Sequence, residues 1–189
     1  MADLQIGHPH NNSLYVIFMF SMPFDRKNIR LSRENYLGLR AYFVTICCDK
    51  RQSYLAIPRI ADRVILLLQE CAARQSFVLH AYCLMPDHLH LLAEGNEPCS
   101  DLLELVRVFK LRTAFEFRKA GGQRLWEMSY YDHILRPKDV IENVACYIWW
   151  NPVRKGLCSS PNQFPYSGSQ TIPWISRASR APSRSAPWK

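Results

Sequence analysis

The chain has 189 residues, a length that fits one domain with terminal extensions better than two domains. Apolar residues make up 48% of it and charged residues 21%, which suffices for a buried core and excludes a wholly disordered chain. The 24 Lys and Arg residues outnumber the 16 Asp and Glu residues, and the net charge of +8 favours a polyanionic partner, nucleic acid before a membrane.

The first 29 residues are predicted to be a poorly structured N-terminal extension. Their longest apolar run, from Leu14 to Phe24, is shorter than the roughly 20 residues that a membrane-spanning helix needs. The run also lacks the basic n-region and the cleavage site of a signal peptide. The seven cysteines have no C-x-x-C spacing, which is typical of reduced thiols and not of a disulfide framework or a zinc site. We therefore expect a cytoplasmic protein that is not bound to a membrane.

From residue 40 onward the chain alternates between patterns typical of strands and of helices. The predicted elements are a strand over 40–48, a helix over 57–74, strands over 77–84 and 88–93, a helix over 100–119, a strand over 130–135, and a last helix that begins at or near Pro137 and stops near Asn151. Asp101 suits the first turn of the second helix, and Pro152 disfavours helical geometry at the residue before it. This order predicts an α+β, ferredoxin-like split β-α-β-β-α-β fold with an antiparallel sheet and an additional C-terminal helix.

The C-terminal part of the chain is basic and rich in Ser and Pro. No acidic residue follows Glu142, whereas six basic residues do. We expect the folded domain to occupy residues 30–170 and residues 171–189 to form a basic, disordered tail that adds to the attraction for phosphates.

The sharpest local motif is His88-Leu89-His90. Alternate side chains of a strand share a face, so the two imidazoles point together while Leu89 and Leu91 point to the core. Two histidines placed in this way form half of a divalent-metal site. Two ordinary surface histidines on a half-buried strand remain an alternative interpretation.

A second motif lies near the end of the last predicted helix, where Tyr147 and Asn151 share one face at i,i+4 spacing. A tyrosine hydroxyl can act as a nucleophile when a nearby cation activates it, and an amide oxygen can bind a hard metal ion. A core tyrosine and a helix-ending asparagine would give the same spacing.

Basic residues on the helix over 100–119 are candidates for phosphate contacts, although a helix face that is only exposed to solvent would show the same pattern. The DNA-binding candidates are Arg107, Lys110, Arg112 and Arg118, joined by Arg154 and Lys155 after the last helix. Trp126, Tyr130 and Tyr131 can stack on unpaired bases, with core packing expected for at least one of them. His133, next to Asp132, is a candidate for steering a metal-site histidine, ranked below His88 and His90.

Taken together, five segments resemble a known family. MPDHLHLL, FKLRTAFEF, LWEMSYYDHILR, YIWWNPVRKGL and FPYSGS, in this order, resemble the REP-associated tyrosine transposases, which are single-tyrosine HUH transposases of the insertion-sequence 200-like group. The resemblance covers about residues 30–169. It selects Tyr147 among nine tyrosines, which spacing alone cannot do.

The resemblance implies a role for each matching residue. His88 and His90 match the metal-binding pair, Asn151 matches the polar residue that completes the metal shell, and Tyr147 matches the nucleophile. Tyr130, Tyr131 and Tyr166 match aromatic positions outside the chemistry. The implied cofactor is Mg²⁺ or Mn²⁺. The implied substrate is single-stranded hairpin DNA from REP-like palindromes, cleaved and rejoined through a 5′-phosphotyrosine by a monomer or a homodimer.

Three other interpretations are compatible with the sequence. A domesticated, non-catalytic protein could bind hairpin DNA without cutting it. A metal-dependent hydrolase could use water in place of Tyr147 as the nucleophile. An RNA-binding module is the weakest alternative, because no RNP-type aromatic signature lies on the predicted strands.

Overall fold

The structure is a computed structural model, and it describes residues 31–137 and 139–173. The expected N-terminal extension and residues 174–189 of the expected basic tail lie outside the described residues. The strands are β1 (Ala41–Cys47), β2 (Phe77–Met85), β3 (His88–Gly95), β4 (Tyr131–Ile134) and β5 (Ser167–Gly168). The α-helices are α1 (Pro58–Arg74), α2 (Leu102–Lys119), α3 (Ile141–Trp149) and α4 (Asn151–Arg154).

The strands form one five-stranded sheet in the order β4-β1-β3-β2-β5. Each neighbouring pair is antiparallel. The first four strands, with α1 between β1 and β2 and α2 between β3 and β4, confirm the predicted ferredoxin-like order. The short edge strand β5 was not expected, because two residues are too few to leave a pattern in the sequence.

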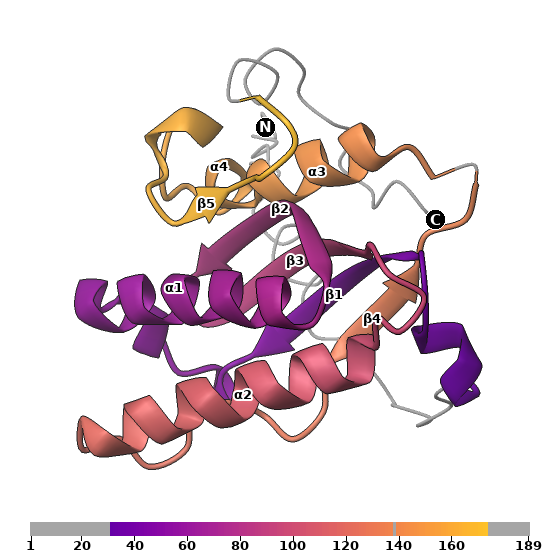
Figure 1. Cartoon of the computed structure of the whole chain (residues 1–189). Helices are drawn as coiled ribbons and strands as arrows, with labels where there is room; N and C mark the ends of the chain where they lie inside the picture. Colours follow the sequence, from indigo (N-terminus) through magenta and orange to yellow (C-terminus); the bar gives the residue numbers. More distant parts are fainter. Residues whose placement is uncertain (1–30, 138, 174–189) are drawn as a thin grey trace, which may run out of the picture. The chain divides into compact units, whose positions relative to one another are not determined.

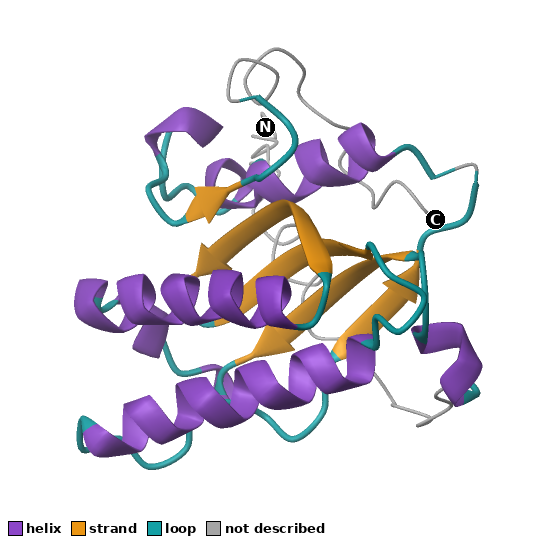
Figure 2. Ribbon diagram, in the orientation of Figure 1, coloured by secondary structure: helices purple, strands orange, loops and turns teal. Residues whose placement is uncertain are grey.

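The sheet separates two layers of helices, as Figures 1 and 2 show. Neighbouring residues along a strand point to opposite faces of a sheet. Val44, Leu89 and Leu91 pack in a core with α1 and α2. Phe43 and Leu92 pack in a second core with α3 on the other face. This second face is called the α3 face below.

The ends of the helices follow local chemistry. Pro58 occupies the first turn of α1, where proline is tolerated, and the side chain of Asp101 accepts from the backbone N–H groups of Leu103 and Glu104 at the start of α2. The expected place of Asp101 is thus confirmed. Gly121, with φ of +90°, lies where α2 ends, as glycine commonly does.

The last predicted helix differs from expectation at both ends. It begins at Ile141 rather than near Pro137, because the Asp139 carboxylate accepts from Arg136 N at 2.8 Å, a contact that competes with an earlier helix start. It ends at Trp149, close to the predicted stop, but helical structure resumes as α4 with Pro152 in the first turn.

Two further findings concern the whole described part of the chain. No helix in it is long and apolar enough to cross a membrane. All seven cysteines lie within it, and none of them forms a disulfide.

Candidate active site

The paired histidines lie on the α3 face, as their alternation along β3 predicts. Leu89 and Leu91, the residues that alternate with them, are at most 1% exposed in the opposite core. His88 Nε2 and His90 Nε2 approach to 3.0 Å. The predicted convergence of the two imidazoles is therefore present in the fold.

Two neighbouring side chains orient these rings. Asp87 Oδ1 lies 2.6 Å from His88 Nδ1, and Thr45 Oγ1 lies 2.9 Å from His90 Nδ1. A carboxylate can only accept here, so His88 carries a proton on Nδ1. The Thr45 hydroxyl can donate to His90 Nδ1 or accept from it; with Thr45 as acceptor, both neutral rings would present their Nε2 lone pairs to a bound cation.

The fold explains how these partners come to lie there. Asp87 precedes β3 in the tight turn from β2, and the antiparallel register pairs Thr45 of β1 directly with His90. Sequence reasoning missed both residues. The adjacency of Asp87 to His88 is a signal that could have identified it, whereas Thr45 is placed by strand register alone.

The electrostatics keep the Asp87 carboxyl ionised and the His90 imidazole neutral, the forms that a metal site needs. Burial alone would raise the pKa of the Asp87 carboxyl, but the hydrogen bond from His88 and the charge of Arg51 lower it overall. Burial lowers the pKa of His90 well below its usual value, and the nearby His88 and Arg154 act in the same direction. His90 is therefore neutral and offers a lone pair, as a metal ligand must.

Arg51 reaches Asp87 from an unusual backbone. Its guanidinium lies 3.2 Å from Asp87 Oδ2. Both Lys50 (φ 50°) and Arg51 (φ 56°) adopt the left-handed conformation that costs free energy for residues other than glycine. This strained pair directs the chain after β1 back to the turn that holds Asp87.

Tyr147 projects from α3 toward the same part of the sheet. The ring of Phe43 contacts both His90 and Tyr147, with ring centroids 5.6 Å and 6.3 Å apart respectively. Residues separated by 57 positions in the sequence are thus joined through one shared aromatic neighbour. The structure brings the predicted nucleophile and the histidine pair to one face of the sheet.

Asn151 lies where the helix is interrupted after Tyr147. Pro152 has no N–H to donate to the carbonyl of Ile148, four residues earlier. Asn151 Nδ2 donates to the carbonyls of Ile148 and Tyr147 at 3.1 Å and 3.0 Å. Since carbonyls accept only, the amide orientation is fixed, with Oδ1 on the side away from them.

These residues fit a divalent metal ion. Among the described residues no group of three or more His, Cys, Asp and Glu side chains could hold a metal, so the histidine pair has no third neighbour of these types in such a group. The two convergent imidazole nitrogens and the oriented amide oxygen of Asn151 supply nitrogen and oxygen donors.

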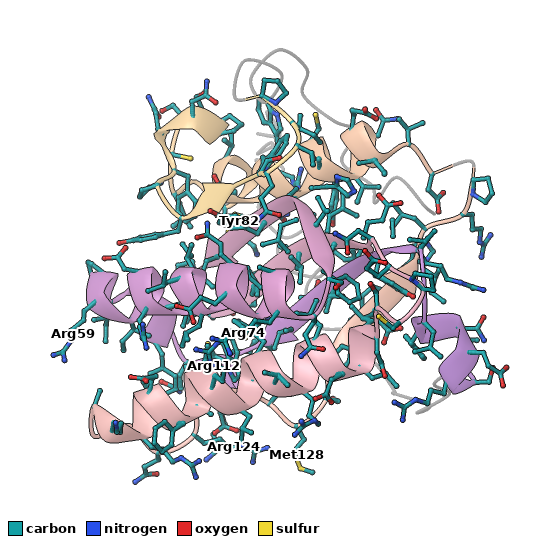
Figure 3. The ribbon with its side chains drawn as sticks, in the orientation of Figure 1. Arg59, Arg74, Tyr82, Arg112, Arg124 and Met128 are labelled. Carbon is teal, nitrogen blue, oxygen red and sulfur yellow. The ribbon has the colours of Figure 1, made fainter. Side chains whose placement is uncertain are left out.

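The basic residues predicted on α2 lie away from this site, because α2 packs on the opposite face of the sheet. Arg112 lies between α1 and α2 (Figure 3), and its guanidinium lies 2.6 Å from the Glu70 carboxylate. Lys110 donates to the carbonyls of Glu127 and Met128, and Arg107 pairs with Glu104. Arg118 is exposed on this far side.

The residues after α3 lie nearer to the site. Arg154 donates to the Tyr147 carbonyl at 2.6 Å, and its guanidinium carbon lies 4.5 Å from the centre of the Tyr147 ring. Lys155 follows it and is exposed.

The remaining candidates divide between core and surface. Trp126 is 4% exposed and donates to Thr113 Oγ1, so core packing accounts for one of the three aromatic residues, as expected. Tyr131 lies exposed on the α3 face, since it pairs with Thr45. His133 lies on this face too, with its Nε2 3.3 Å from Asp139 Oδ2. Asp87 and Thr45 therefore contact the rings of His88 and His90, whereas His133 contacts Asp139.

The chain resembles known transposases in sequence and in fold. It is 29% identical over 152 residues to a Haemophilus influenzae protein provisionally named a REP-associated tyrosine transposase, covering 71% of this chain and 82% of the relative. It is 22% identical to the REP-associated tyrosine transposase of Escherichia coli, covering 71% and 79%. A solved REP-associated tyrosine transposase, bound to a REP hairpin, shares the fold with a TM-score of 0.60 and 19% identity over 70% of this chain and 78% of that one.

A family model supplies the decisive match. It describes IS200-like transposases, a metal-dependent family, and it matches residues 38–150. This span is more than half of the chain and includes His88, His90 and Tyr147. The chain therefore belongs to the IS200-like transposase family.

Proposed function

We propose that this transposase cleaves and rejoins single-stranded hairpin DNA through a covalent 5′-phosphotyrosine at Tyr147, with Mg²⁺ or Mn²⁺ held by His88, His90 and Asn151. The observation that supports the proposal best is the contact that Phe43 makes with both His90 and Tyr147. The solved relative bound to a REP hairpin supports a hairpin as the substrate.

Neighbouring residues orient the proposed metal ligands and the Tyr147 ring. Asp87 keeps a proton on Nδ1 of His88, Thr45 orients the ring of His90, and the Asn151 amide is fixed by the helix carbonyls. A divalent ion in this donor set would offset the negative charge that develops on the phosphate oxygens in the transition state. Phe43 and Arg154 hold the Tyr147 ring against the sheet.

In the cleavage step Tyr147 Oη forms a bond to phosphorus while the bond from phosphorus to the 3′ oxygen breaks. The phenolic proton is released and the departing 3′ oxygen gains a proton. The DNA is left with a free 3′-hydroxyl and a 5′-phosphate attached to tyrosine. Attack of a 3′-hydroxyl on this link reverses the step and rejoins the strands, so no external energy source is required.

Phosphate contacts would add affinity without sequence information. Of the basic candidates, Arg107, Arg118, Arg154 and Lys155 are exposed, and Arg154 contacts Tyr147. We propose Arg107, Arg118 and Lys155 as backbone contacts.

The test uses purified protein, Mn²⁺ and labelled single-stranded hairpins from the repeats that flank its own gene, separated on a denaturing gel. We expect a protein-linked DNA band that is absent in Tyr147→Phe. The variant loses only the hydroxyl, so its fold and DNA affinity serve as internal controls.

Two results would contradict the proposal. Cleavage that survives in Tyr147→Phe would indicate a hydrolase with water as the nucleophile. Hairpin binding without cleavage by the unmodified protein would indicate a non-catalytic binding protein.

A further inference from the structure

The end of α3 is held by side chains as well as by its backbone. The helix is interrupted at Trp150, and Asn151 Nδ2 and Arg154 Nη2 both donate to the carbonyl of Tyr147, at 3.0 Å and 2.6 Å. A helix end normally leaves its last carbonyls without intrahelical donors. Here two side chains supply donors to the residue that bears the proposed nucleophile.

Arg154 also contacts the ring of that residue. Its guanidinium lies over the Tyr147 ring, 4.5 Å from the centroid, in the geometry of a cation–π interaction. Desolvation lowers the pKa of the guanidinium, although the group stays charged. One side chain therefore contacts Tyr147 at two points, the carbonyl and the aromatic face.

Phe43 restrains the same ring from the sheet. The Phe43 and Tyr147 rings meet at 70°, with centroids 6.3 Å apart. The position of a tyrosine hydroxyl oxygen depends on χ1, because the oxygen lies on the axis of the second torsion. Contacts to the ring from Phe43 and from Arg154, which is itself anchored on the Tyr147 carbonyl, restrain χ1. Bond formation in line with the leaving group requires the hydroxyl to point in one direction.

We propose that Arg154 is a positioning residue for Tyr147: it fixes the direction of the hydroxyl and does not serve primarily as a phosphate contact. This inference rests on the proposed function, since it concerns the residue that attacks the DNA. It gives the Arg of the Asn-Pro-Val-Arg segment a role toward the protein's own helix. The phosphate contacts then fall to other basic residues.

The test combines fluorine NMR with DNA assays. Protein labelled with 3-fluorotyrosine gives a Tyr147 resonance that Tyr147→Phe assigns by its absence. In Arg154→Ala we expect this resonance to broaden or split as the ring samples further rotamers. Arg74→Ala, which removes an exposed arginine from the last turn of α1 (Figure 3), should leave the resonance unchanged.

The DNA assays separate positioning from binding. In Arg154→Ala we expect the rate of adduct formation at saturating hairpin to fall about tenfold or more, with the Kd for the hairpin and its salt dependence unchanged. Arg154→Lys can reach the carbonyl or the ring but not both, so it should recover part of the rate. Thermal melting shows whether each variant is folded under assay conditions.

Several outcomes would overturn the inference. An unchanged Tyr147 resonance in folded Arg154→Ala is one. Another is a normal rate at saturation together with a salt slope that is smaller by about one phosphate contact, the signature of DNA backbone binding. If the unmodified protein forms no adduct, the proposed function fails, and the fluorine resonance still decides the positioning role by itself.

Discussion

Asn151 shows how a single residue can serve both the end of a helix and the proposed metal site. Its amide nitrogen donates to two carbonyls at the end of α3, and this contact leaves its oxygen on the opposite side. An aspartate has the same shape and is a stronger ligand for a hard metal ion, yet it has no N–H to donate. The choice of asparagine is thus explained by the helix end.

Asn151→Asp should accordingly destabilise the protein. The substitution removes two hydrogen bonds and places a carboxylate against two carbonyl oxygens, so we expect a loss of about 1–3 kcal/mol in the free energy of unfolding. Urea denaturation measures it. Asn143→Asp in the first turn of the same helix is the matched control and should be neutral or slightly stabilising. Equal stabilities of the two variants would show that the amide does not hold the helix end.

Asp87 is expected to act on metal affinity. Without its carboxylate, His88 loses the contact that fixes its tautomer and ring orientation, and such partners typically contribute about 10–100-fold to metal affinity. We therefore expect Asp87→Ala to weaken Mn²⁺ binding by about that factor in isothermal titration calorimetry. Asp62→Ala, at an exposed position of α1, provides the control. Equal affinities in both variants would assign Asp87 to the turn alone.

At the scale of elements, the sequence patterns predicted where helices and strands lie along the chain, but not which face of the sheet each helix covers. Alternation in His88-Leu89-His90 predicted a shared face, because a strand fixes that locally. The arginines of α2 were predicted only as phosphate contacts, and the sequence did not show that α2 packs on the side of the sheet opposite the histidine pair. Which helix covers which face depends on non-local packing, and spacing within one helix does not contain it.

The last helix shows the same limit. Pro152 correctly predicted that the helix ends near Asn151, because its effect on the preceding turn is local, but the short helix α4 that follows was not predicted. The start of α3 was predicted too early, since the contact of Asp139 with Arg136 N competes with the helix there. The assignment of Tyr147 as nucleophile came from resemblance, and its contact with Phe43 required the fold.

Two arginines of α2 should therefore behave differently. Arg112 contacts Glu70 and Cys71 of α1, so Arg112→Ala should lower stability, by about 0.2–1 kcal/mol for a partly exposed pair, and leave hairpin binding unchanged. Arg118→Ala should keep its stability and reduce the salt slope of hairpin binding by about one phosphate contact. Fluorescence anisotropy across a salt series measures both. Identical slopes in the two variants would contradict this division of α2.

At the scale of the whole molecule, the sheet separates the larger hydrophobic core from the candidate active site. The core shared with α1 and α2 includes Tyr42, Val44 and Leu91, whereas the α3 face combines a smaller apolar cluster with the polar site. Burial on the first face has an electrostatic consequence of its own. The hydroxyl of Tyr42 and the thiol of Cys48 both belong to that core and are difficult to ionise there.

The stability of the fold should consequently fall at alkaline pH. Desolvation by burial raises the pKa of Tyr42 from 10.0 to about 12 and that of Cys48 from 9.0 to about 12. Above each unfolded value the unfolded chain has lost a proton that the folded chain keeps, so rising pH favours unfolding. Each group can contribute at most about 1.4 kcal/mol per pH unit, beginning near pH 9 for the thiol and near pH 10 for the phenol. Urea denaturation over this range should show the decline, with Cys48→Ala reducing its early part and Tyr42→Phe its later part. If the decline in both variants is as steep as in the unmodified protein, the alkali-sensitive groups lie elsewhere in the molecule.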